Sequence, residues 1–277
     1  MPKTTGGLGW LVQALAGEKI DVCVVGETLL NEADKALVRV IRQYGWDIEV
    51  IGNSHAHKGG LCVIYNKTDC ECTILPTESE YILHAHIQKS GLEMIEIVGT
   101  YIQYGFNERQ DEEVFGEIER IVGDSMQEHT IVMGDLNAQL QSTMVEHWTE
   151  TEHRKRISES PKRHSKRKRE RGELLYKMLH NGNMLTTNGR KDGATELAKE
   201  PLYTFKMDLS TEGGTLLDYV LVRERNIERC LEQRNIFDYS KAMKTKHALV
   251  VLKYNTPLET RCRKATESTK RGVHRKR

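Results

Sequence analysis

The stretch that decides the fold runs from residue 130 to 138 and reads TIVMGDLNA. It begins as a short β-branched run, typical of a buried strand, and changes at once to Gly134-Asp135, with Asn137 two residues later. An ionisable side chain directly after a buried strand lies at the rim of a sheet, where the ends of other strands also open. The stretch therefore predicts a core strand that carries polar groups to a shared site.

Working outward, four other segments place a polar side chain at the end of an apolar run. Each one alone has an ordinary explanation: Glu27 could be a turn residue, and His247 a structural histidine. Asp218 lies inside a strand pattern, where an unpaired carboxylate is costly to bury, so it needs a partner. The four segments are VVGET at 24–28, VGTY at 98–101, TLLDY at 215–219 and KHALVVL at 246–252.

Together these side chains form a chemically coherent set. It contains carboxylates for a hard divalent cation, an amide beside one of them, a histidine, and a further carboxylate to orient that histidine. Mg²⁺ takes oxygen ligands and keeps several waters, so one or two protein carboxylates suffice to hold it. Such an ion polarises a phosphoryl oxygen. The set therefore favours phosphoryl chemistry that uses Mg²⁺ or Mn²⁺.

The remaining pattern predicts an α/β fold. Helices are expected at 6–19, 33–44, 108–124 and 172–180, with Asn31 as a plausible cap of the second. Five short extended runs without helices between them predict an antiparallel meander. These runs span 47–51, 60–66, 70–75, 81–88 and 92–100, and further strands are expected at 20–25, 130–133, 184–187, 202–206, 215–223, 227–236 and 247–254. Two sheets packed face to face with helices outside, a four-layer α/β sandwich, suit this order best.

The size of the chain suits one large domain or two small ones. The chain has 277 residues, of which 38% are apolar and 29% charged, so it can bury a core. Its longest apolar runs are far shorter than the roughly 20 residues of a membrane-spanning helix. The first residues lack the zones of a signal peptide, which disfavours secretion. Six scattered cysteines are interpreted as reduced thiols of an intracellular protein, nuclear or otherwise cytoplasmic.

The net charge of +1 conceals two strongly basic segments. Residues 154–171 carry ten Lys or Arg against two Glu, and residues 261–277 carry eight against one. The rest of the chain then has 23 basic and 37 acidic residues. We expect a domain at 1–254 with an exposed basic insertion at 154–171, followed by a basic, disordered tail at 255–277. The insertion would contact phosphate outside the catalytic site, through Arg167, Lys168 and Arg169, or an import receptor; a charged loop without a specific partner is the alternative.

These motifs, in their order and spacing, resemble the endonuclease/exonuclease/phosphatase (DNase I-like) superfamily. Within it, they are most similar to the apurinic/apyrimidinic-type endonuclease domain of LINE-type (non-LTR) retrotransposons. The similarity covers about residues 20–254. Its elements are GDLNA at 134–138, VGET at 25–28, LDYV at 217–220, GGLCV at 59–63, RG at 171–172 with the helix to Leu179, LTTN at 185–188 and LYTF at 202–205.

The resemblance implies a role for each residue of the set. Glu27 would be the main metal ligand, and the cofactor would be Mg²⁺ or Mn²⁺. Asp135 would activate or position the attacking water, and Asn137 would hold the phosphate beside it. Three further roles are implied: Tyr101 against the scissile phosphate, His247 on a phosphate oxygen, and Asp218 orienting His247.

Two departures from the family pattern stand out. The family begins with a strand that carries an Asn of the metal site, and residues 1–9 here show no such strand, so we expect this N-terminal strand to be missing. The family's last motif is Ser-Asp-His, where this chain has Thr245-Lys246-His247. An ammonium beside the expected cation would weaken Mg²⁺ binding.

Three functions follow from the sequence. The first is a Mg²⁺-dependent phosphodiesterase, a DNA endonuclease derived from a non-LTR retrotransposon. The second is a catalytically inactive relative that binds nucleic acid through its basic segments. The third is a phosphatase acting on inositol lipids or other small phosphates. The phosphatases prefer Asn-Tyr-Arg after Gly-Asp-Leu and a Trp-Cys-Asp-Arg element in place of the LDY at 217–219, and both differences favour the nuclease. DNA is the expected partner, and the oligomeric state stays open.

Overall fold

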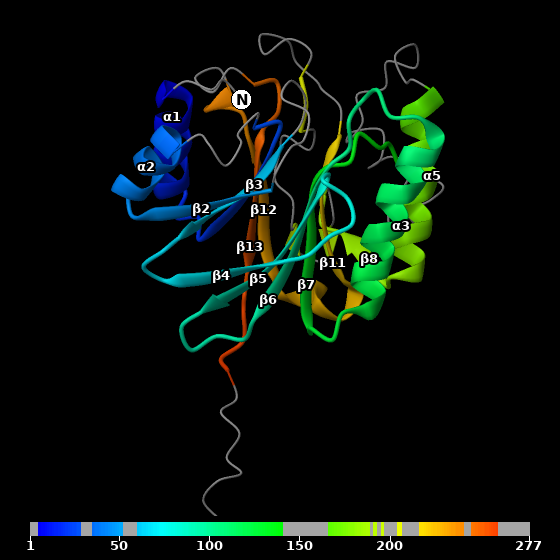
Figure 1. Ribbon diagram of the computed structural model, residues 1–277. Coiled ribbons are helices and arrows are strands. Elements are labelled where there is room, and N and C mark those ends of the chain that lie inside the picture. The colour runs from blue at the N-terminus through cyan, green and yellow to red at the C-terminus, as the bar shows by residue number, and fades with distance from the viewer. Residues whose placement is uncertain are drawn as a thin grey trace, which may run out of the picture.

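In the computed structural model, a three-stranded and a six-stranded β-sheet pack face to face between two layers of helices (Figure 1), and four further strands form two separate pairs. The structure describes residues 5–28, 35–51, 60–140, 166–188, 191–192, 195–196, 204–206, 216–240 and 245–259. The predicted four-layer α/β sandwich is thereby confirmed. None of the described helices is both long enough and apolar enough to cross a membrane.

The helices and strands follow the predicted order closely. The helices are α1 (Thr5–Gly17), α2 (Lys35–Gln43), α3 (Glu108–Asp124), α5 (Lys166–Asn181) and the 3₁₀ helix η2 (Glu224–Arg229). The strands are β1 (Val22–Gly26), β2 (Trp46–Ile51), β3 (Leu61–Asn66), β4 (Cys70–Leu75), β5 (Ile82–Lys89), β6 (Ile95–Tyr101), β7 (His129–Asp135), β8 (Met184–Thr186), β9 (Lys191–Asp192), β10 (Thr195–Glu196), β11 (Asp218–Arg223), β12 (Cys230–Ile236) and β13 (Leu249–Tyr254).

The smaller sheet has the order β1-β3-β2, with antiparallel neighbours. Its outer face is covered by α1 and α2, whose Leu11, Leu15 and Ile41 are fully buried against it. Its inner face contributes Leu61 and Val63 to the core between the sheets. Burial of this kind contributes about 1.5–3 kcal/mol per large apolar side chain, so these contacts fix how the sheets pack.

The larger sheet has the order β4-β5-β6-β7-β11-β8. Only the central pair β6–β7 is parallel, because α3 forms the crossover between these strands. The start of α3 was predicted at residue 108, and a capping box at Asn107 and Gln110 fixes it there. On the outer face of this sheet, α3 and α5 bury apolar side chains that include Phe115, Ile118 and Leu175.

The prediction of one five-stranded meander was wrong. The first two runs, β2 and β3, form a hairpin in the smaller sheet, whereas β4, β5 and β6 form the antiparallel edge of the larger one. The chain changes sheets in the short turn between Asn66 and Cys70. Both β3 and β4 carry buried side chains into the core between the sheets, so their apolar patterns alone could not show the change of sheet.

The basic segment at 154–171 is also not wholly an exposed insertion. Residues 154–165 lie outside the described part of the chain, but α5 already begins at Lys166. Arg171 is fully buried and donates from Nε to Asp111 Oδ2 at 2.9 Å and from a terminal nitrogen to the Gln103 carbonyl at 2.7 Å. It thus joins α5, α3 and the loop that follows β6. The tail from residue 260 onward, with Cys262, lies outside the described residues, and the other five cysteines are free thiols.

A hairpin of β12 and β13 completes the layer of the smaller sheet, and it packs on β7 and β11. A cavity of about 800 Å³ lies between β1 and β13 and is lined by every residue of both strands. Its floor is formed by side chains of the larger sheet, among them Ile97, Ile131 and Met133. Among the described strands, β1 pairs only with β3 and β13 only with β12, so each has one unpaired edge. No described strand precedes β1, as predicted, because residues 5–17 form α1.

Candidate active site

One end of this cavity gathers the polar residues that the sequence placed at strand ends. Glu27 follows β1, Tyr101 ends β6, Asp135 ends β7 and Asp218 begins β11. In the strand register, Asp135 lies opposite Tyr101 on one side and opposite Asp218 on the other. Three neighbouring strands therefore present their side chains in one row, and His247 joins the row from the segment before β13.

Gly134 makes the turn into this row possible. It has a φ of 141°, a conformation that L side chains rarely adopt, and a Cβ there would lie 1.9 Å from the Thr100 carbonyl oxygen. The glycine therefore lets β7 approach β6 closely while the next residue, Asp135, turns toward the cavity.

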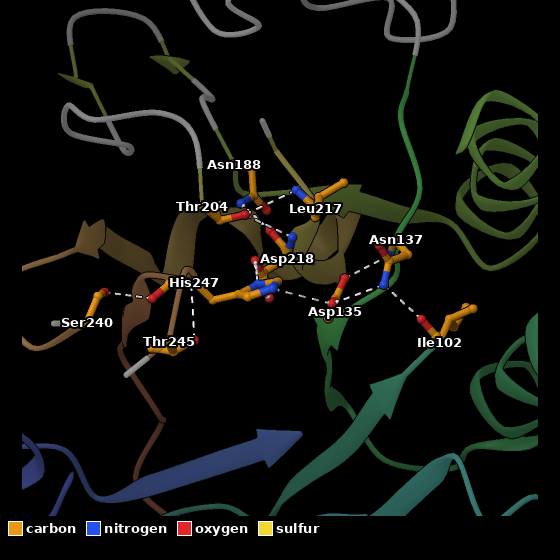
Figure 2. A network of polar contacts seen from close by, with 10 residues as sticks. All are labelled: Ile102, Asp135, Asn137, Asn188, Thr204, Leu217, Asp218, Ser240, Thr245 and His247. Carbon is orange, nitrogen blue, oxygen red and sulfur yellow. Dashed lines mark hydrogen bonds and ion pairs between the residues drawn. The ribbon is translucent and has the colours of Figure 1, made fainter. Parts of the chain in front are cut away.

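Asn137 fixes the Asp135 carboxylate. Its backbone N–H donates to Asp135 Oδ1 at 2.9 Å, and its Nδ2 donates to Asp135 Oδ2 at 3.1 Å and to the Ile102 carbonyl at 2.9 Å (Figure 2). Asn137 is 7% exposed and does not line the cavity. The predicted phosphate contact is therefore not what the structure shows, because both Nδ2 hydrogens are bonded within the protein. Asn137 positions Asp135.

His247 lies between two carboxylates. Its Nδ1 is 2.9 Å from Asp218 Oδ2 and 3.1 Å from Oδ1, and its Nε2 is 3.9 Å from Asp135 Oδ2 (Figure 2). A hydrogen bond from Nδ1 to a carboxylate orients the ring and leaves Nε2 facing the site. The predicted partnership of Asp218 with His247 matches this geometry.

The charged groups in this row shift the pKa values of Asp135 and His247. Burial and the negative charge of Asp218 raise the pKa of Asp135 well above its usual range. Burial lowers the pKa of His247, but the charge and hydrogen bond of Asp218, helped by Asp135, outweigh it and raise that pKa to about 9. The imidazole is therefore protonated at neutral pH, and Nε2 is a hydrogen-bond donor. Perturbed values of this size gather at functional sites.

A second set of residues, for which the sequence predicted no role, holds Asp218 and His247 in place. The Thr204 hydroxyl accepts hydrogen bonds from the backbone N–H groups of Leu217 and Asp218, and Asn188 Nδ2 donates to the Asp218 carbonyl (Figure 2). The edge of the Phe205 ring packs on His247 with 4.9 Å between ring centroids. Thr204 and Phe205 lie in the LYTF motif and Asn188 in LTTN, so those motifs were the available signal.

Ser240 and Thr245 fix the backbone of His247. The Ser240 hydroxyl donates to the His247 carbonyl at 2.7 Å, and the His247 N–H donates to the Thr245 hydroxyl at 3.1 Å (Figure 2). The histidine is thus held by its ring and by its main chain.

Glu27 reaches the row from the other sheet. The Tyr101 hydroxyl donates to Glu27 Oε1, and burial together with this carboxylate raises the pKa of Tyr101. Gly26 lies against the Tyr101 side chain, so that a Cβ on it would be 3.4 Å from the Tyr101 Cβ. Close packing at Gly26 therefore brings β1, and with it Glu27, to the end of β6. Five of the six predicted residues thus line this end of the cavity, and the sixth, Asn137, is joined to it through Asp135.

The donor set fits a hard divalent cation. Glu27, Asp135 and Asp218 supply carboxylate oxygens, and one oxygen each of Asp135 and Asp218 lies within 4.8 Å of a His247 nitrogen and of each other. Burial is the main reason why the pKa of Asp135 is raised, and the negative charges of Asp218 and Glu27 add to it; a cation bound among these carboxylates would relieve their repulsion. Mg²⁺ and Mn²⁺ prefer such oxygen ligands.

The structure changes the prediction for Lys246. Its side chain is exposed and does not line the cavity, unlike the residues on either side, Thr245 and His247. The main chain here pairs with the segment around Phe205, with Lys246 accepting from the Lys206 N–H and His247 bridging to Phe205. The expected repulsion between the Lys246 ammonium and a bound cation is therefore not supported.

The basic residues at the start of α5 lie in different surroundings. Arg169 is exposed, whereas Arg167 pairs with Asp111 at 2.6 Å. Lys168 is half-buried, and burial lowers its pKa while the charge of Asp135 acts in the opposite direction. The first turn of α5 therefore approaches the site, contrary to the expectation that this segment stays apart from it.

Comparisons with known proteins agree with this fold. No family model matches the chain, and no curated protein sequence matches it. Among solved structures, the endonuclease domain of TRAS1, a telomere-specific non-LTR retrotransposon, aligns with a TM-score of 0.63 and 17% identity over 92% of this chain and 94% of that one. An AP endonuclease from Archaeoglobus fulgidus gives 0.64 and 17% over 90% and 94%. The 3'-5' exonuclease NExo from Neisseria meningitidis gives 0.62 and 16% over 91% and 96%. The chain therefore has the endonuclease/exonuclease/phosphatase (DNase I-like) fold.

Proposed function

We propose that this chain is a divalent-metal-dependent phosphodiesterase that nicks DNA, an endonuclease of the non-LTR retrotransposon type. The observation that carries the proposal is the row of Asp135, His247 and Asp218, facing Glu27 at the open end of the cavity. The fold is shared with nucleases, including a retrotransposon endonuclease domain, and this supports the same function.

The residues divide the chemistry between them. Asp135 in its ionised form, which a bound cation would favour, accepts the proton of the attacking water at its carboxylate, and Asn137 holds that carboxylate in place. Protonated His247 donates from Nε2 to a phosphate oxygen, and Asp218 keeps its ring in that orientation. Tyr101 holds the Glu27 carboxylate at the rim. Glu27 would be the main holder of Mg²⁺ or Mn²⁺, which supplies polarisation of the phosphoryl group and stabilises the leaving oxyanion.

A metal-dependent plasmid-nicking assay tests the proposal. Glu27→Ala, Asp135→Ala and His247→Ala should each lower the nicking rate by about 10²–10³, the usual cost of one lost transition-state contact. Glu71→Ala, which changes an exposed carboxylate on the edge strand β4, is the matched control and should keep full activity. Undiminished cleavage by Asp135→Ala or His247→Ala would refute the assignment.

Two other outcomes would favour the alternatives. One of the similar structures is described as the 3' phosphatase NExo bound to a product DNA hairpin, so release of inorganic phosphate from a 3'-phosphorylated oligonucleotide should be measured in parallel. Phosphate release without nicking would favour a phosphatase. Binding to the duplex without either reaction would favour an inactive nucleic-acid-binding relative.

We further propose that Arg169 contacts the DNA backbone, because it is the exposed member of the predicted set Arg167, Lys168 and Arg169. Arg169→Ala should reduce the slope of log K against log[salt] by about 0.9, the value for one released counterion. Arg167→Ala should destabilise the fold, since its partner Asp111 is buried. An unchanged salt slope in Arg169→Ala would show that this residue touches no phosphate.

A further inference from the structure

A second cluster of titratable residues lies on the outer face of the larger sheet. His84 and His86 are two residues apart on β5, so both point to the same face, and Glu96 lies directly opposite His86 on β6. The two Nε2 atoms face one carboxylate oxygen, Glu96 Oε1, at 2.9 Å from His84 and 3.8 Å from His86. All three atoms lie within 4.8 Å of one another.

Hydrogen bonds to its second oxygen hold the Glu96 carboxylate in place. Glu96 is 3% exposed, and its other oxygen, Oε2, accepts hydrogen bonds from the Thr130 hydroxyl at 2.8 Å and from the Ser125 hydroxyl. These two donors fix the rotation of the carboxylate, so that Oε1 points at the histidines. Partners of this kind orient the ligands of protein metal sites.

The outer side of the cluster is open. The side chains of His84 and His86 are 13% and 23% exposed, so water or an ion can reach them. A simple ion pair explains why His84 is beside Glu96. It does not explain why a second imidazole also directs its Nε2 at the same oxygen.

We propose that His84, His86 and Glu96 bind a divalent transition-metal ion, Zn²⁺ in particular, with water as a further ligand. Two imidazoles and one carboxylate are a donor set that suits zinc, whereas Mg²⁺ prefers oxygen ligands alone. Zinc bonds of about 2.0–2.1 Å place tetrahedral ligand atoms about 3.4 Å apart. The present separations of 2.9 and 3.8 Å from Glu96 Oε1 to the two histidine nitrogens lie on either side of that value.

This site is separate from the candidate active site. Glu96 lies near the beginning of β6 and Tyr101 at its end, and five strand residues span about 16 Å. A bound ion would join β5 to β6, and through Ser125 and Thr130 also to the end of α3 and to β7. The proposal is therefore independent of the nuclease function.

Zinc titration tests it, with a competing chromophoric indicator and an excess of Mg²⁺ to occupy the candidate active site. The unaltered chain should bind one Zn²⁺ that Mg²⁺ does not displace. At about 100 times the Kd, Zn²⁺ should raise Tm by about 5 °C or more. His86→Ala and Glu96→Gln should each weaken zinc binding by about 10- to 100-fold; the glutamine keeps an acceptor for Ser125 and Thr130, which protects the fold.

His180→Ala is the matched control, because His180 is exposed in the last turn of α5. It should bind zinc as the unaltered chain does. Nicking in Mg²⁺ should be the same in His86→Ala as in the unaltered chain, which separates this proposal from the nuclease function. Absence of zinc binding, equal affinity in all variants, or loss of the tight zinc in His247→Ala instead would overturn the proposal.

Discussion

Replacing Asp218 with asparagine removes a charge beside His247 and changes little else in the side chain's size. The pKa of His247 is about 9 against an ordinary 6.5, and each pKa unit corresponds to about 1.4 kcal/mol. The cationic imidazole is thus favoured by about 3 kcal/mol, part of which comes from Asp135. We expect Asp218→Asn to lower the pKa of His247 by about one to two units, measured by NMR titration of the imidazole in metal-free protein.

The same change alters the pH dependence of stability. A histidine whose pKa is raised by folding stabilises the protein fully below 6.5, and this stabilisation is lost as pH rises through about 9. The raised pKa of Asp135 acts in the same direction, because the folded protein holds that proton more tightly. The free energy of unfolding of the unaltered chain, measured with EDTA, should therefore fall between about pH 6.5 and 9, and Asp218→Asn should flatten this fall.

Asp238→Asn is the control, since Asp238 is exposed and does not line the cavity. It should leave both the titration of His247 and the stability profile unchanged. If Asp218→Asn left the pKa of His247 near 9, the charge of Asp218 would not be the cause of the shift, and the reasoning that links the two residues would be refuted.

Three further predictions concern single positions. Gly134→Ala should destabilise the fold by about 3 kcal/mol or more, measured by denaturant unfolding, because a Cβ there collides with the Thr100 carbonyl; a stable variant would contradict this geometry. Arg171→Met should cost about 1–3 kcal/mol in the same assay, because buried Asp111 loses one of its two guanidinium partners and keeps the other, Arg167; an unchanged stability would contradict this reasoning. Lys246→Asp should change the Mg²⁺ concentration for half-maximal nicking by less than about threefold, since exposed charges are well screened; a tenfold gain would show that Lys246 does face the cation.

Local signals predicted much of this fold. The helix predicted at 108–124 matches α3, and the capping box at Asn107 is a local feature that accounts for the agreement at its start. The division of the strands between two sheets was not predictable, because β3 and β4 both bury side chains in the same core between the sheets. The burial of Arg171 was missed for a similar reason: its partner Asp111 lies sixty residues earlier in the chain. A run of basic residues gives no sign of such a partner.

In the candidate site, too, the sequence could predict some residues but not the contacts between distant segments. Residues at strand ends could be predicted, since a strand pattern fixes where each side chain emerges. The LYTF motif marks Phe205, but its contact with His247 depends on how two distant segments meet, so the motif does not show the partner. The positioning role of Asn137 likewise needed the Ile102 carbonyl, which belongs to another strand's end.

The cavity between β1 and β13 has a consequence for assembly. Within the described part of the chain, one edge of β1 and one edge of β13 pair with no other strand, and both strands line the same cavity. Such edges are templates for pairing with further chain, which is the route to strand exchange between copies and to aggregation. Amide hydrogens on these edges should exchange with solvent much faster than those of the central pair β6–β7. Association between copies of the purified protein should accordingly increase with its concentration, and the first intermolecular contacts should form along β1 and β13.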